Sequence, residues 1–228
     1  MLQFTVIILW GHIMKVLLIG NGTSRKDLDI SSFVKTHNID KTVGCNGIWR
    51  DYDTDFVVMW DNKPIYEFIV HKCEYEWYSR LVIPDSYEKN IVGNLVGRTS
   101  GSYALYWSIL HFNPTDIYMI GFDYFLDYID CGSQIYSYIN EEAFVCSQVL
   151  SEIRAEYMSN YMKSKEDITF HILVPDGINL NYTLDNASNV RTITKKNKVV
   201  KTPAPLTFEG IVPITNRKVF DLYDANII

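Results

Sequence analysis

The feature that most constrains the fold is an apolar run that ends in two closely spaced glycines, residues 15–24 (KVLLIGNGTS). An unbroken apolar run of this kind is typical of a parallel strand that is buried on both faces. Gly20 and Gly22 permit a tight turn and let a ligand approach the bare backbone. We expect Ser24 to cap a helix over residues 25–38, which carries a patchy apolar face of helical spacing.

Strand, glycine turn and helix start together predict a nucleotide-phosphate site, because the free N–H groups at a helix start point at the anion. A tight turn in any other α/β protein is an equally good reading of Gly-x-Gly alone. The stretch is not a Walker loop, since Gly-Lys-Ser/Thr is missing. Nor is it a full dinucleotide fingerprint, since Arg25 stands where the third glycine belongs.

Composition indicates one domain with one substantial core, since the chain has 228 residues and 47% hydrophobic composition. A net charge of -6 speaks against a general nucleic-acid-coating protein. Residues 1–13 are apolar but too short to span a bilayer and lack a basic flank, so we expect an extension without functional role before a single domain at 14–228. The four cysteines show no Cys-x-x-Cys or zinc spacing, which predicts free thiols in a reducing cytoplasm: Cys45, Cys73, Cys131 and Cys146.

Short apolar strands alternate with helical stretches along the chain. This alternation predicts an α/β fold, a Rossmann-like, mostly parallel sheet with helices on both faces. After the first strand and helix, we expect strands at 42–45, 55–60, 80–83, 116–120 and 168–174, and helices at 64–73, 100–112 and 141–162.

Two further segments have no steady period. Residues 124–140 are rich in Tyr and Asp, which suits a lid over a site. A polar tail follows from residue 176, and we expect its dense basic cluster at 195–198 to be a solvated turn.

Four polar side chains stand where strands are expected to end, namely Asn21, Asn46, Asp61 and Asp123. In open parallel sheets, ligands bind outside the carboxyl ends of the strands. We therefore expect one cleft to gather these four residues.

Several short segments, taken in order, resemble the bacterial CMP-sialic-acid-dependent sialyltransferases of glycosyltransferase family 42. They are residues 20–24 (GNGTS), 45–46 (CN), 99–101 (TSG) and 120–123 (IGFD). The similarity covers roughly residues 15–175. The resemblance implies a single Rossmann-like domain with a lid, a CMP-linked sugar as donor, inversion at the anomeric centre, and neither a metal nor another cofactor.

The resemblance also implies a nucleotide site, with Asp123 beside the ribose or base. An asparagine amide both donates and accepts, which suits a ribose hydroxyl or a cytosine edge. Thr99 and Ser100 precede a helix, so they would receive the leaving phosphate as its charge develops, although plain helix capping explains them too. The remaining positions implied for the nucleotide are Gly20, Asn21, Gly22, Ser24, Asn46 and Gly101.

On the sugar side the sequence departs from the family. Sialic-acid-using members carry a Gln, an Asn and an Arg where this chain has Gly47, Asp61 and Gly97, although Arg98 is adjacent. The nucleotide-facing positions are kept while those toward the sugar are lost. We therefore expect a donor sugar other than sialic acid, held in part by Asp61 and Arg98.

The family's histidine base has no counterpart, so another group must take the acceptor proton. The candidates are carboxylates, and for all but the first we favour exposed surface charge as the interpretation: Asp123, Asp127, Asp130, Glu141 and Glu142. The histidines at 71, 111 and 171 lie in apolar helical or strand patterns, so we expect structural roles for them. The alternating aspartates at 51–55 precede a strand, which predicts a solvated turn rather than a metal site.

The sequence thus favours a glycosyltransferase that moves a sugar from a CMP-activated donor to a hydroxyl acceptor. The acceptor is either a glycan or a hydroxylated base in viral DNA. Two alternatives remain: a nucleotide-binding protein that transfers nothing, and a phosphotransferase, for which the Walker lysine is missing. No transmembrane segment is expected, and a homo-oligomer is compatible with the sequence.

Overall fold

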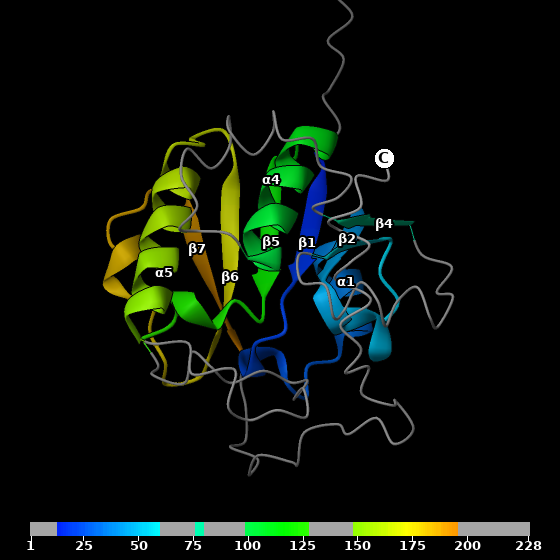
Figure 1. The fold of residues 1–228 in the computed structure, drawn as a ribbon, viewed down its shortest axis with the longest axis horizontal. Coiled ribbons are helices and arrows are strands. Elements are labelled where there is room, and N and C mark those ends of the chain that lie inside the picture. The colour runs from blue at the N-terminus through cyan, green and yellow to red at the C-terminus, as the bar shows by residue number, and fades with distance from the viewer. Residues whose placement is uncertain (1–12, 60–75, 80–98, 128–147, 196–228) are drawn as a thin grey trace, which may run out of the picture.

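The computed structural model describes residues 13–59, 76–79, 99–127 and 148–195. These residues form a seven-stranded sheet with the order β4-β3-β2-β1-β5-β6-β7, in which every neighbouring pair runs parallel (Figure 1). The strands are β1 (Lys15–Ile19), β2 (Lys41–Cys45), β3 (Phe56–Met59), β4 (Glu76–Ser79), β5 (Asp116–Ile120), β6 (Thr169–Pro175) and β7 (Val190–Lys195).

Three α-helices are described, together with short 3-10 turns. Figure 1 shows α4 and α5 side by side over one face of the sheet. The helices are α1 (Ile30–His37), α4 (Ser100–Phe112) and α5 (Gln148–Lys163), and the turns are η1 (Thr23–Arg25), η2 (Asn46–Arg50), η4 (Asp123–Phe125) and η6 (Tyr182–Leu184). No helix among the described residues is long and apolar enough to cross a membrane.

The sheet separates two apolar clusters, because successive side chains of a strand point to opposite faces. Val16 and Leu18 of β1 belong to the cluster that also holds buried residues of α4 and α5. Leu17 and Ile19 belong to the other cluster, which α1 covers. Both faces of β1 are fully buried, which explains its unbroken apolar run. The predicted Rossmann-like α/β fold is confirmed.

The strand order reverses between β1 and β5. From β1 the sheet extends through β2 and β3 to β4, and β5 then pairs with the other side of β1. In doubly wound sheets the crevice at such a switch point is where ligands bind. The turns that follow β1 and β5 therefore define the candidate site.

Most expected elements agree with the structure to within two residues, and the helix at 100–112 and the strand at 116–120 agree at both ends. The helix expected at 25–38 is wrong at its start, since residues 23–25 form η1 and α1 begins at Ile30. The N-cap is Asp29, whose Oδ1 accepts the Ser32 N–H at 2.9 Å. Asp27 between the two elements has φ 58°, which interrupts a right-handed helix.

The described parts of the expected lid and tail differ from the prediction at a few residues. Phe125 and Leu126, expected at the start of a lid, are buried in the core, at 0% and 5% exposure. The expected polar tail contains β7, which pairs in parallel with β6, and Lys195 ends that strand buried rather than in a solvated turn. A strand lies at 76–79. The strand expected at 80–83, the helix at 64–73, residues 128–147 and residues 1–12 lie outside the described residues.

Replacing Asp29 by alanine should destabilise the protein by about 1 kcal/mol, because the Ser32 N–H loses its acceptor. Urea unfolding measures the change. Ser31→Ala is the control, since Ser31 is exposed in the same turn. An unchanged midpoint for Asp29→Ala would contradict the assigned start of α1.

Candidate functional site

Two turns interlock at the carboxyl ends of β1 and β5. The Gly20 N–H donates to the Ile120 carbonyl at 2.8 Å, and the Gly22 N–H donates to the Gly121 carbonyl at 3.0 Å. A Cβ at Gly20 would lie 2.3 Å from the Gly121 oxygen, a separation that real structures do not permit. Gly121 has φ 72°, the left-handed region that glycine enters at no steric cost. The close approach of the two turns therefore requires glycine at both positions.

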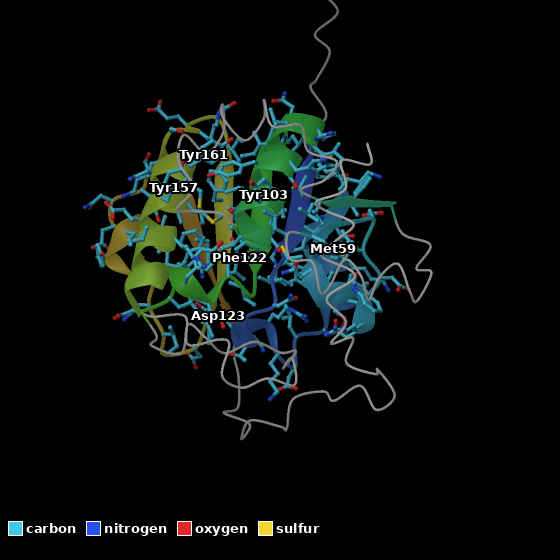
Figure 2. The ribbon with its side chains drawn as sticks, viewed as in Figure 1. Met59, Tyr103, Phe122, Asp123, Tyr157 and Tyr161 are labelled. Carbon is cyan, nitrogen blue, oxygen red and sulfur yellow. The ribbon has the colours of Figure 1, made fainter. Side chains whose placement is uncertain are left out.

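Asp123 joins the two turns through its carboxylate. Its Oδ2 accepts the Ser24 N–H at 3.1 Å and the Thr23 hydroxyl at 3.3 Å, and its Oδ1 accepts the Ser24 hydroxyl. The side chain is 6% exposed, and burial raises its pKa against the opposing effect of these hydrogen bonds. Figure 2 shows Asp123 beside the turn that follows β1.

The turn after β1 spends its backbone donors within the protein. The N–H groups of Gly20, Gly22 and Ser24 donate to Ile120, Gly121 and Asp123 respectively. A Cβ at Gly22 would lie 2.3 Å from Asp123 Oδ1, so the space beside this glycine holds a carboxylate. Gly20 and Gly22 were expected to expose their backbone to a ligand. In the structure, their N–H groups and the space beside Gly22 are occupied by other residues of the protein. Their assignment to the nucleotide stays a prediction.

Two buried cations brace the same turn from outside. Arg25 is 4% exposed, and its Nε donates to the Gly20 carbonyl at 2.6 Å while its guanidinium lies 3.3 Å from Asp51. Lys195 at the end of β7 donates from Nζ to the carbonyls of Ser24, at 3.5 Å, and Lys26. Burial lowers the pKa of Lys195, and the charge of Asp27 opposes this effect.

Asn21 and Asn46 follow neighbouring strands, as the sequence predicted. Ile19 and Gly44 are the last residues paired between β1 and β2, and each asparagine lies two residues beyond its member of this pair. Asn46 has φ 47°, a conformation that asparagine tolerates better than most residues. The Asn21 Oδ1 atom is buried and has no hydrogen-bond partner among the described residues. An orphaned amide oxygen is costly, so this atom points to a missing donor.

The start of α4 lies against the turn that follows β5, through Gly101 and Phe122. Thr99 is the N-cap, and its Oγ1 accepts the Ser102 N–H at 3.1 Å while the Ser102 Oγ accepts the Thr99 N–H at 2.9 Å. Thr99 therefore acts as a helix cap, the alternative that its sequence position left open. Ser100 is buried at 5% exposure. Gly101 faces a ring carbon of Phe122, which a Cβ would approach to 2.8 Å.

Tyr124 brings a hydroxyl to this end of α4. The hydroxyl donates to the Met158 sulfur at 2.7 Å, and a Cβ at Gly101 would lie 3.2 Å from its oxygen. Burial raises the pKa of Tyr124 well above its usual value, and the Arg154 charge and the Thr99 side chain oppose that shift. The positive charge of Arg154 thus acts on the Tyr124 hydroxyl.

Other predicted residues lie elsewhere. His171 Nε2 is 2.8 Å from Asp116 at the start of β5, and its ring stacks on Tyr118. His111 contacts the Trp107 carbonyl at 3.0 Å, and the structural role expected for both histidines stays a prediction. Cys45 is a free thiol, as expected, and burial raises its pKa to about 12.

The remaining predicted residues are exposed or lie outside the described residues. Asp51 and Asp53 are exposed, as a solvated turn requires, although Asp51 also pairs with Arg25. Among the described residues no group of three or more His, Cys, Asp or Glu side chains converges on a metal position. Asp127 is exposed. The residues of the sequence-based predictions that lie outside the described residues are Asp61, Arg98, His71, Asp130, Glu141, Glu142, Cys73, Cys131 and Cys146.

Sequence reasoning missed Arg25, Lys195 and Arg154 as part of this region. Arg25 carried a signal, since it replaces the third glycine of a dinucleotide fingerprint. Lys195 also had one, because the β-branched run over residues 190–195 (VRTITK) is typical of a strand. Arg154 lies in a helix of ordinary composition, and nothing in its local sequence marks it.

No protein-family model matches the sequence, and no curated protein sequence matches it. A solved structure described as a putative exported protein from Burkholderia pseudomallei is similar over 72% of each chain, with 11% identity and a TM-score of 0.24. That score is too low to carry any argument about fold or function. The case for a function therefore depends on the geometry of the site.

Gly20→Ala should cost about 1–3 kcal/mol of unfolding free energy, because its methyl group would have to displace the Gly121 backbone. Denaturant unfolding of Gly20→Ala measures this cost. Gly22→Ala should be at least as costly as a typical core overpacking, since its Cβ meets the Asp123 carboxylate. Wild-type stability in either variant would show that the two turns are not interlocked.

The stability difference between wild type and Asp123→Asn should depend on pH. A raised carboxyl pKa means that the folded state holds the proton more tightly, so Asp123 favours folding most below its usual pKa of 3.8. This advantage is lost as the pH rises through the folded-state pKa, whereas asparagine does not titrate. Urea unfolding from pH 3.5 upward compares the two proteins, and a constant difference would contradict the raised pKa.

Proposed function

We propose that this protein is a glycosyltransferase that moves a sugar from a CMP-activated donor to a hydroxyl acceptor. The observation that carries the proposal is the buried, unpartnered Oδ1 of Asn21 at the switch point of a parallel sheet. A parallel sheet of this kind presents nucleotide sites at that edge. The chemical identity of the nucleotide comes from the resemblance in the segments 20–24, 45–46, 99–101 and 120–123.

The unpartnered Oδ1 of Asn21 can accept a hydrogen bond from an N–H or O–H group of a ligand. The amino group of cytosine and the hydroxyls of ribose are such donors, and the Asn46 amide on the neighbouring strand end offers both a donor and an acceptor. Asp123 accepts hydrogen bonds from Thr23 and Ser24 in the turn that holds Asn21. The proposal therefore assigns direct nucleotide contacts to the asparagines.

In the proposed reaction the acceptor oxygen attacks the anomeric carbon, and the bond from that carbon to the CMP phosphate oxygen breaks. The phosphate leaves with the bonding electron pair, and the acceptor proton passes to a base. The first turn of α4 and the positive charge of Arg154 near the Tyr124 hydroxyl support a position for the leaving phosphate there. Ser100 begins this turn and is buried against it.

The departures at positions 47, 61 and 97 favour a donor sugar other than sialic acid. The acceptor is proposed to be a glycan or a hydroxylated base in DNA. The reaction as written needs no metal or other cofactor, and the proposed location is cytoplasmic. A homo-oligomer is compatible with all of these features.

A specific observation favours the alternative of a nucleotide-binding protein that transfers nothing. Both oxygens of Asp123, whose residue follows β5 at the switch point, already accept hydrogen bonds. If no other group takes the acceptor proton, binding is retained and transfer is lost. The two readings differ in turnover alone.

CMP should raise the melting temperature more than UMP, GMP or AMP at equal concentration. A ligand present at 100 times its Kd stabilises by about 2.7 kcal/mol, which is readily measured. Differential scanning fluorimetry across the four nucleotides tests the donor assignment. Equal protection by UMP or AMP would rule out a CMP-linked donor.

Asn21→Ala, Asn46→Ala and Ser100→Ala should each weaken CMP binding by about 1–3 kcal/mol if their hydrogen bonds to the ligand are buried. Isothermal titration calorimetry measures the loss. Asn160→Ala is the matched control, since Asn160 is exposed on α5. If Asn21→Ala and the control both bind CMP with wild-type affinity, Asn21 does not contact the ligand, and the proposal loses its main support.

A further inference from the structure

We propose that the Asp123 carboxylate is a built-in anion that permanently fills the glycine turn after β1 and positions Asn21 for the ligand. The donor phosphate then binds outside this turn, and Asp123 does not act as the base. The claims about the donor phosphate and the base rest on the proposed function. The claim that the Asp123 carboxylate fills the turn does not.

The geometry around the carboxylate is that of an anion held by a loop. Three donors converge on it: the Ser24 N–H at 3.1 Å, the Thr23 hydroxyl at 3.3 Å and the Ser24 hydroxyl. A glycine turn that binds a phosphate offers the same kinds of donor to an external oxyanion. Here the oxyanion belongs to a residue about a hundred positions along the chain, at the end of β5.

Several features oppose replacement of the Asp123 carboxylate by an external phosphate. Asp123 is 6% exposed, and Gly22 lies against its carboxyl oxygens so closely that a Cβ there would fall 2.3 Å from Oδ1. A phosphate brought beside the ionised carboxylate would place two negative charges together in a poorly solvated position. The carboxylate would have to leave first, and the interlocked backbone of Gly20 and Gly121 holds the turn that carries it.

The consequence for the ligand lies in Asn21. Its flanking residues Gly20 and Gly22 are both anchored through their N–H groups, and Asp123 fixes the following Thr23 and Ser24. Asn21 is thus the one position of the turn whose side chain keeps a buried, unpartnered acceptor. Asp123 is a positioning residue that acts through this turn, and it makes no contact with the reacting atoms.

Formate rescue tests the occupancy directly on the full-length protein. Asp123→Ala removes the carboxylate, so its melting temperature should fall, and 100 mM sodium formate should restore at least about 2 °C of it relative to 100 mM sodium chloride. Formate should shift wild type and Asp167→Ala no more than chloride does, since Asp167 is exposed. Absence of any formate-specific shift in a folded Asp123→Ala would overturn the proposal, as would an equal shift in wild type.

Asp123→Asn covers the case in which Asp123→Ala does not fold. The amide has nearly the same shape, its oxygen can accept the Ser24 N–H, and the Ser24 hydroxyl can turn to accept from its NH₂ group. We expect this variant to fold without any formate response and to bind CMP within about threefold of wild type, since a well-oriented amide keeps the turn closed. A formate response in folded Asp123→Asn would overturn the occupancy.

Turnover separates positioning from base catalysis. If Asp123 only positions Asn21, kcat of Asp123→Asn should stay within about tenfold, while loss of a general base costs roughly 100-fold or more. Normal CMP affinity with a 100-fold fall in kcat would overturn the positioning role. If CMP does not bind to wild type at all, the proposed function fails, and the formate response still decides whether Asp123 fills the turn.

Discussion

The backbone contact between Gly20 and Gly121 is the constraint on which the rest of the site depends. β1 and β5 pair in register from Lys15 and Asp116 to Ile19 and Ile120, and the Gly20 and Gly22 N–H groups extend the ladder past the strand ends. The two backbone segments are so close that neither Gly20 nor Gly121 has room for a Cβ. Their closeness also brings Asp123 against the turn after β1, which fixes the residues that face the switch point.

Charge is distributed around this contact in an ordered way. The carboxyl group of Asp123 bonds to the Ser24 N–H of the turn, and the side chains of Arg25 and Lys195 donate to carbonyls of residues 20–26. Each of these groups is buried, and each has hydrogen-bond partners, as buried charges require. Support of this kind fixes the backbone on either side of Asn21, and a site side chain keeps its orientation only when its surroundings hold it in place.

Fold class and most strand positions were predictable because a strand that is buried on both faces needs an unbroken apolar run, such as that of β1. The partners within the site were not. Ser24 was predicted to cap a helix since it follows a glycine turn, but its hydroxyl bonds to Asp123 and the cap is Asp29, a choice made by tertiary contact. Phe125 reads as part of an irregular polar stretch, and only packing against the core shows that it is buried. Lys195 illustrates the same limit, since strand propensity indicates β7 but not where its last side chain lies.

The bond from Lys195 to the turn after β1 sets an order of events during synthesis. Residues 15–26 leave the ribosome early, yet their outer brace is supplied by a residue about 170 positions later. The central pairing of β1 with β5 likewise waits for the chain to reach residue 120. Contacts of such long sequence separation form late, since the loop between them must close first. A nascent chain truncated before β7 would thus possess most of its sheet while the turn beside Asn21 still lacked its final support.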